Sequence, residues 1–103
     1  HINAELQYDW DYPPTINTEK EANFAAETAR ALYGVDRVDT SFRPSMASED
    51  FAVMLQEVPG AYIWLGIGED AAPLHNPHYD FNDDVLLTGA DLLAGLARDF
   101  LKA

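Results

Sequence analysis

The chain has 103 residues, which allows one small domain at most, and 48% of them are hydrophobic, as in globular rather than disordered proteins. Acidic residues outnumber basic ones by 18 to 6, and a net charge of −12 disfavours nucleic acid because the phosphates would be repelled. The absence of cysteine excludes disulfides and thiolate chemistry within these residues and favours a cytoplasmic location. No apolar run reaches the roughly 18 residues of a membrane span, so no membrane partner is expected.

Residues 2–12 alternate without a fault between apolar and polar side chains, which predicts a strand with one buried face. Its apolar face carries Ile2, Ala4, Leu6, Tyr8, Trp10 and Tyr12. A strand needs a neighbour to pair with its backbone, and no second alternating run nearby could form a hairpin with it. We therefore expect the partner strands to lie upstream of this sequence.

A helix is predicted after the proline pair 13–14, from about Thr18 to Gly34. Thr18 and Glu21 have the spacing of a capping box, and alanines then recur at helical spacing. Gly34 is predicted to end the helix. A face of small residues favours close packing against a sheet or another helix.

Two strands and one helix are predicted between residues 38 and 67. A short strand is expected at 38–42, followed by a helix in which Ser48 is the capping residue and which ends before the Pro-Gly pair 59–60. Residues 61–67 are apolar at both odd and even positions, as in a strand buried on both faces. This pattern is typical of the interior of a layered α/β sheet.

The last predicted helix opens at residues 82–84 and runs nearly to the C-terminus. Its predicted buried stripe consists of Leu86, Ala90, Leu93, Leu96, Ala97, Phe100 and Leu101. Helices and strands thus alternate after the proline pair 13–14, which predicts an α/β fold with a domain boundary at that pair.

Two of the three histidines lie in the loop 73–80, between the doubly buried strand and the last helix. Loops that follow such strands bind ligands in α/β folds, and Pro73 and Pro77 restrict the backbone. His75 is therefore a candidate metal ligand, although a lone loop histidine is more often a surface residue. Because Pro77 argues against one helical face for both histidines, His78 is interpreted as a surface or supporting residue.

Three further residues each have two interpretations. Asp80 either accepts the second N–H of a ligating histidine or caps the following helix. Ser48 and Glu49 either line a cleft where free N–H groups of a helix N-terminus bind a substrate carboxylate, or Ser48 merely caps the helix while Glu49 and Asp50 complement its dipole. A catalytic metal site needs about three protein ligands, and no other residues have metal-ligand spacing. The sequence is therefore interpreted as a piece of a larger enzyme.

Five motifs, in order and in register, resemble the C-terminal end of the metal-dependent amidohydrolase and aminoacylase-type carboxypeptidase family, which includes hippurate hydrolase and auxin-conjugate hydrolases. They are YPPTIN at 12–17, MASEDF at 46–51, VPGA at 58–61, LG at 65–66 and LHNPHYDF at 74–81. The resemblance implies that residues 1–15 are the last strand of, and exit from, an α+β lid or dimerisation domain. Residues 16–103 would then be the C-terminal part of a two-metal, aminopeptidase-like catalytic domain.

The resemblance also implies roles for individual residues. His75 matches the final histidine ligand of two divalent metal ions, whether zinc, manganese, cobalt or nickel. Glu49 matches a motif lining the active-site cleft, and Asp80 matches the closing aspartate of the histidine motif. The other ligands and the general-base glutamate of the family lie upstream of the lid, so no catalytic residue is expected in this segment, which alone should be inactive.

In the full-length enzyme, the implied reaction is attack of a metal-activated water on the amide bond of an N-acyl amino acid or small peptide. The implied partners are that substrate, the missing N-terminal part of the enzyme and further copies in a homo-oligomer. The competing hypothesis is a self-contained, small acidic binding or scaffold module without catalysis. That module would fold cooperatively as a monomer from these residues alone.

Overall fold

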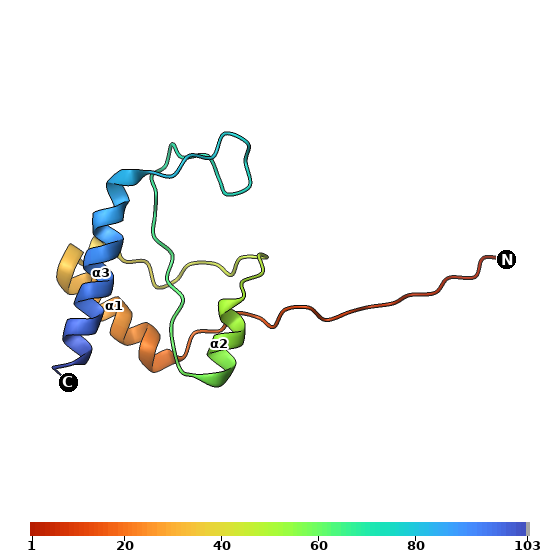
Figure 1. The fold of residues 1–103 in the computed structure, drawn as a ribbon, viewed down its shortest axis with the longest axis horizontal. Coiled ribbons are helices and arrows are strands. Elements are labelled where there is room, and N and C mark those ends of the chain that lie inside the picture. The colour runs from red at the N-terminus through yellow and green to blue at the C-terminus, as the bar shows by residue number, and fades with distance from the viewer. Residues whose placement is uncertain (103) are drawn as a thin grey trace.

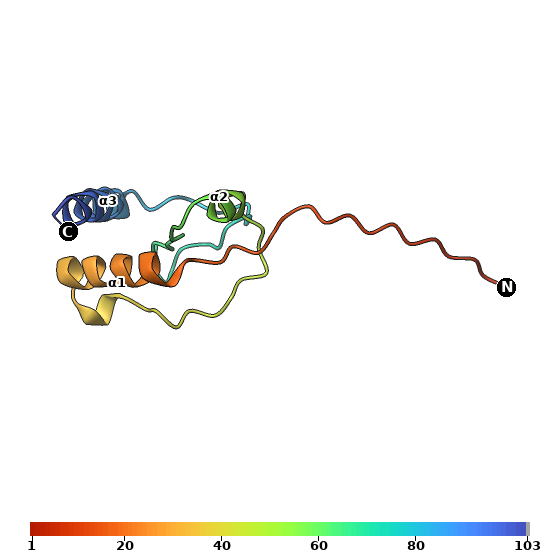
Figure 2. The same cartoon turned by 90° about the horizontal axis from the view of Figure 1, so that it is seen from below.

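The computed structural model describes residues 1–102, in which helices are joined by long irregular segments. The elements are α1 (Glu19–Tyr33), the 3₁₀ helix η1 (Val35–Arg37), α2 (Phe51–Glu57), the 3₁₀ helix η2 (Asp83–Val85) and α3 (Leu86–Phe100). α1 packs against α3, whereas α2 stands apart from both helices, on the side toward the N-terminal segment (Figures 1 and 2). None of the helices within residues 1–102 is both long and apolar enough to cross a membrane.

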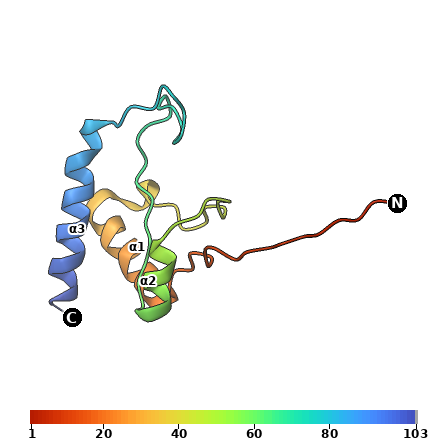
Figure 3. The ribbon, with the colours of Figure 1, turned by 45° about the vertical axis from the view of Figure 1, so that its right-hand side comes forward.

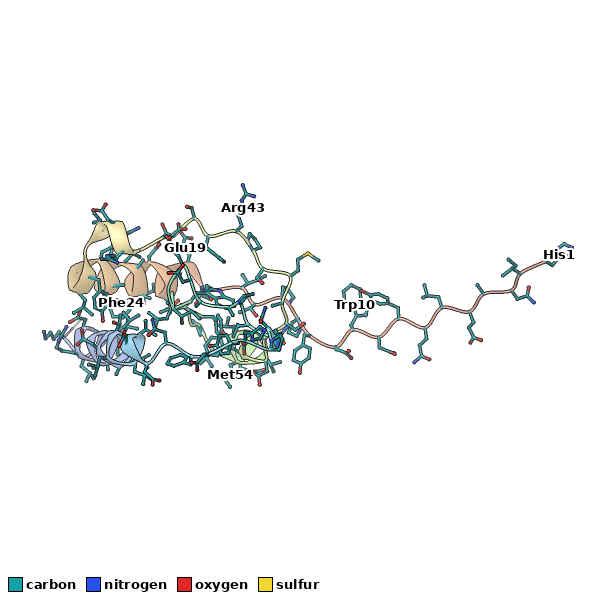
Figure 4. All side chains as sticks on the ribbon, turned by 90° about the horizontal axis from the view of Figure 1, so that it is seen from above. His1, Trp10, Glu19, Phe24, Arg43 and Met54 are labelled. Carbon is teal, nitrogen blue, oxygen red and sulfur yellow. The ribbon has the colours of Figure 1, made fainter. Side chains whose placement is uncertain are left out.

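The three predicted strands do not form within residues 1–102, and these residues build a helical structure instead of α/β layers. The segment 2–12 extends away from the helices as an arm, and Trp10 projects from it (Figures 1 and 4). Ile2 and Trp10 are 95% and 86% exposed. The physical reason is that strand backbone must pair with a neighbouring strand, and the described chain supplies none for the arm or for residues 38–42 and 61–67.

α1 begins and ends where the sequence predicted, but its cap differs from the prediction. Thr18 is the N-cap residue, and Gly34 ends the helix with a φ of 92°, which glycine adopts at the lowest cost. The predicted capping box with Glu21 is wrong, because the Thr18 side chain makes no capping hydrogen bond. Its hydroxyl instead donates to the Gly60 carbonyl at 2.9 Å and accepts from the Gly60 N–H at 2.8 Å.

α1 and α3 approach each other through small residues. Ala25 and Thr28 of α1 are buried, and Gly95 of α3 faces them. A Cβ added to Gly95 would lie 2.7 Å from Leu32 Cδ1 and 3.6 Å from Thr28 Cγ2, so the absence of a side chain allows the helices to come this close. The predicted close packing of the alanine-rich face of α1 is confirmed.

The predicted buried stripe of α3 is wrong in its phase around the helix. The helix buries Leu92 and Gly95, whereas Leu93 and Phe100 are 68% and 71% exposed. The sequence places apolar side chains on two faces of α3, and the glycine-bearing face allows the closer approach to α1. The predicted start is confirmed, because the Asn82 side chain accepts a hydrogen bond from the Asp84 N–H at 3.0 Å and caps η2.

Thr18→Val should destabilise the intact protein by roughly 1–2 kcal/mol, because the Gly60 N–H loses its acceptor and its carbonyl loses a donor. Thr18→Ser keeps the hydroxyl and serves as the matched control. Thermal unfolding of the two variants measures the difference. Equal loss of stability in both would show that the hydroxyl is not the stabilising group.

Candidate functional site

Asn17 and Thr18 bind the segment that leaves α2, and we call these contacts the Asn17–Thr18 clamp. The backbone N–H of Thr18 donates to the Gly60 carbonyl at 3.0 Å, in addition to the two bonds of its hydroxyl. The Asn17 side-chain amide donates to the Tyr62 carbonyl at 3.0 Å and accepts from the Tyr62 N–H at 2.8 Å. Side chains thus provide to residues 60–62 the hydrogen bonds that a neighbouring strand would otherwise provide.

The clamp fixes the backbone from which Tyr62 reaches Glu49. The Tyr62 hydroxyl donates to Glu49 Oε2 at 2.9 Å, and the Phe51 N–H approaches Glu49 Oε1 at 3.4 Å. The Tyr62 ring lies near two other rings, with centroid distances of 5.5 Å to Phe51 and 5.6 Å to Trp64. Glu49 and Tyr62 are half-buried, whereas Trp64 is exposed. A hydrogen-bonded carboxylate therefore stands beside an aromatic cluster.

The contact between Glu49 and Tyr62 shifts the pKa of both groups. The hydrogen bond from the Tyr62 hydroxyl is the largest cause that lowers the pKa of Glu49, with smaller contributions from Asp50 and the Phe51 N–H. The same bond is the largest cause that raises the pKa of Tyr62, because it favours the protonated phenol. Glu49 is therefore an anion and Tyr62 a hydrogen-bond donor at neutral pH.

Tyr62→Phe should raise the pKa of Glu49, and Glu49→Gln should lower the pKa of Tyr62, because each substitution removes the partner that favours the present protonation state. NMR titration of the carbons bonded to the ionising oxygens measures both values. The stabilisation from ionised Glu49 is present above its unfolded-state pKa and is lost as the pH falls through the lower folded-state value. Unshifted titrations in both variants would contradict the hydrogen bond.

Ser48 does not occupy the predicted capping position. α2 begins at Phe51, and its N-cap residue is Asp50, whose backbone is already helical and whose side chain makes no capping hydrogen bond. Ser48 lies two residues before this cap and is exposed. The structure therefore places Glu49 in a defined hydrogen-bonded position and leaves Ser48 beside it on the surface.

The histidine loop consists of two consecutive turns. The Asn76 N–H donates to the Pro73 carbonyl at 3.1 Å, and the Tyr79 N–H donates to the Asn76 carbonyl at 2.9 Å. The Asn76 side chain joins them by accepting from the His78 N–H at 2.9 Å. His75 is the third residue of the first turn and has a φ of 67°. That position in a turn with positive φ normally carries glycine or asparagine.

Within residues 1–102, the candidate site residues lie in separate parts of the structure. The histidine loop stands apart from α2 (Figures 1 and 3), and no group of three or more histidine, aspartate or glutamate side chains within residues 1–102 could hold a metal ion. His75 is exposed and presents an imidazole, which suits zinc and related divalent metals but is one ligand of the three or so required. The residues present therefore fit one ligand of a metal site.

Asp80 is exposed beside a shallow hollow of about 510 Å³ between the segments that flank the histidine loop. The alternative capping role of Asp80 is taken by Asn82, which caps η2. Four other acidic residues line the same hollow, namely Glu69, Asp70, Asp83 and Asp84. Part of the acidic charge of the chain is therefore concentrated around this hollow.

The sequence interpretation missed Tyr62 and the side-chain role of Asn17. In the sequence, Tyr62 stands among the apolar residues 61–67 of a predicted strand. A signal was available, because a tyrosine in an otherwise apolar segment usually finds a partner for its hydroxyl. The partner itself lies 13 positions earlier in the chain and cannot be found from local spacing.

Residues 3–99 match the model of Peptidase family M20/M25/M40, and the chain therefore belongs to this family. Hippurate hydrolase of Campylobacter jejuni is 39% identical over 90 residues, which cover 87% of this chain and 23% of that protein. The putative amidohydrolase YhaA of Bacillus subtilis is 36% identical over 97 residues, 90% of this chain and 24% of that protein. IAA-amino acid hydrolase ILR1-like 5 of Arabidopsis thaliana is 33% identical over 94 residues, which cover 87% of this chain and 21% of that protein.

This chain thus spans less than a quarter of the length of these relatives. No solved structure matches it. All three relatives are named as hydrolases, one of them as a putative amidohydrolase, in agreement with the resemblance drawn from the five sequence motifs.

Proposed function

We propose that this chain is part of a metal-dependent amidohydrolase and that His75 supplies one ligand to a pair of divalent metal ions. The observation that carries the proposal is the φ of 67° at His75. A residue with a Cβ pays about 1–2 kcal/mol for left-handed backbone, and such residues cluster at functional sites. Pro73 and Pro77 flank the histidine and limit the loop to few conformations.

The proposed domain organisation follows the boundary at the proline pair 13–14. Residues 1–15 would belong to a lid or dimerisation domain, and residues 16–103 to the catalytic domain. Two apolar segments, 2–12 and 61–67, support this proposal, since each is patterned as a strand, leaves large apolar side chains exposed and pairs with no strand among residues 1–102. In the assembled enzyme they would pair with strands outside this chain.

In the proposed enzyme, the residues of this chain bind a metal ion and orient the substrate. The imidazole of His75 would hold a metal ion, and Asp80 would accept the other imidazole N–H. The ionised Glu49 would accept a hydrogen bond from the substrate, with Ser48 at the same edge of the cleft. When bound, the metals supply polarisation of the amide carbonyl and activation of a water. The proposed substrates are N-acyl amino acids or small peptides, and the proposed assembly is a homo-oligomer.

His75→Ala in the intact enzyme should lower the bound metal and reduce kcat/KM for an N-acyl amino acid such as hippurate by at least about 100-fold. This bound is conservative, because even residues that only support metal ligands are worth about 10–100-fold. Metal analysis and amide hydrolysis measure the two effects. Unchanged values in both would overturn the assignment of His75 as a metal ligand. A wild-type protein that neither binds metal nor cleaves the amide would instead favour the non-catalytic acidic module.

His75→Gly is the matched variant that separates backbone strain from metal binding. It also lacks the imidazole and should bind as little metal as His75→Ala. Glycine adopts a φ of 67° without strain, so this variant should be roughly 1 kcal/mol more stable than His75→Ala. Thermal unfolding without metal measures the difference, and an alanine variant as stable as the glycine variant would contradict the left-handed backbone.

A further inference from the structure

We propose that Tyr62 is a positioning residue that holds the Glu49 carboxylate in one orientation toward a hydrogen-bond donor of the substrate. The Tyr62 hydroxyl reaches Glu49 Oε2 at 2.9 Å, and the two residues come from separate segments on either side of α2. The proposal rests on the proposed function, because it assumes that Glu49 lines the substrate cleft. It adds a residue, Tyr62, that the sequence interpretation did not assign to any site.

The geometry leaves part of Glu49 free for a ligand. Tyr62 binds one carboxylate oxygen, and the Phe51 N–H approaches the other at 3.4 Å. An ionised carboxylate offers about four acceptor sites and no donor, so it can accept more than the bonds from Tyr62 and Phe51. Glu49 is half-buried and keeps an accessible side. The group it can take is therefore a donor, such as the amide N–H of an N-acyl amino acid.

Tyr62 is itself held at both ends, which makes it suited to this role. Its backbone N–H and carbonyl are bound by the Asn17 side chain at 2.8 and 3.0 Å. Its ring contacts Phe51 and Trp64, with centroids 5.5 and 5.6 Å away. A flexible glutamate loses rotamer freedom when it binds a ligand, and a partner that fixes it beforehand reduces that cost.

The chain also contains a matched control for Tyr62. The Tyr33 hydroxyl donates to the Thr88 carbonyl at 2.9 Å and lies 3.2 Å from Asp91 Oδ2, and Tyr33 is half-buried like Tyr62. This tyrosine joins α1 to α3 and takes no part in the proposed site. Tyr33→Phe therefore removes a comparable phenol whose role is structural.

The test is a double-mutant cycle in the intact enzyme with hippurate as the probe substrate. Tyr62→Phe should raise KM by about tenfold and change kcat by less than about twofold, because a contact made equally in the ground and transition states appears in KM. In a Glu49→Ala background the same substitution should change KM by less than about twofold. Tyr33→Phe should leave KM unchanged while lowering the thermal midpoint.

Three results would overturn the role of Tyr62 in an active wild-type enzyme. They are an unchanged KM in Tyr62→Phe, an equal effect with and without Glu49, and an equal KM effect from Tyr33→Phe. Asn17→Ala provides a second variant if Tyr62→Phe fails to fold, since it removes both side-chain bonds to the Tyr62 backbone and should raise KM in the same Glu49-dependent way. A wild-type protein that cleaves no N-acyl amino acid would instead overturn the proposed function.

Discussion

The pairing of Asn17 and Thr18 with residues 60–62 is the contact on which the local architecture depends. It joins the start of α1 to the segment that leaves α2, with hydrogen bonds of 2.8–3.0 Å. Buried and half-buried backbone groups need partners, and here two polar side chains supply them. Because Tyr62 is one of the clamped residues, the same contact that orders the chain also sets the position of Glu49.

The hydrogen bonds of the clamp are important for the structure because the hydrophobic core of this chain is small. Its buried apolar residues within the described chain are Ala25, Ala52 and Leu92, although 48% of the sequence is hydrophobic. Many large apolar side chains remain exposed on the arm, on residues 61–67 and on α3. Exposed apolar surface of this extent marks an interaction surface. This agrees with a chain that spans less than a quarter of its relatives in the family.

Features set by local physics could be predicted from the sequence, and features set by distant partners could not. The start of α1 at Thr18, its end at Gly34 and the opening of the last helix at residues 82–84 could be predicted from local residue preferences, although the Thr18 side chain makes no capping bond. The strands were patterned correctly for a sheet but need neighbours that these residues do not contain. The phase of α3 depended on the contact of Gly95 with α1, which periodicity cannot reveal. The loop position of His75 was predictable, whereas its positive φ arises from the fold of the turn.

We propose that His75 is held in left-handed backbone so that its imidazole can bind a metal. A crystal structure of the intact protein grown with zinc tests this most directly. The account predicts a His75 nitrogen about 2.0–2.1 Å from the metal, with a positive φ at His75 and with Tyr62 still bonded to Glu49. A metal held entirely by other residues, with the His75 side chain directed into solvent, would contradict it.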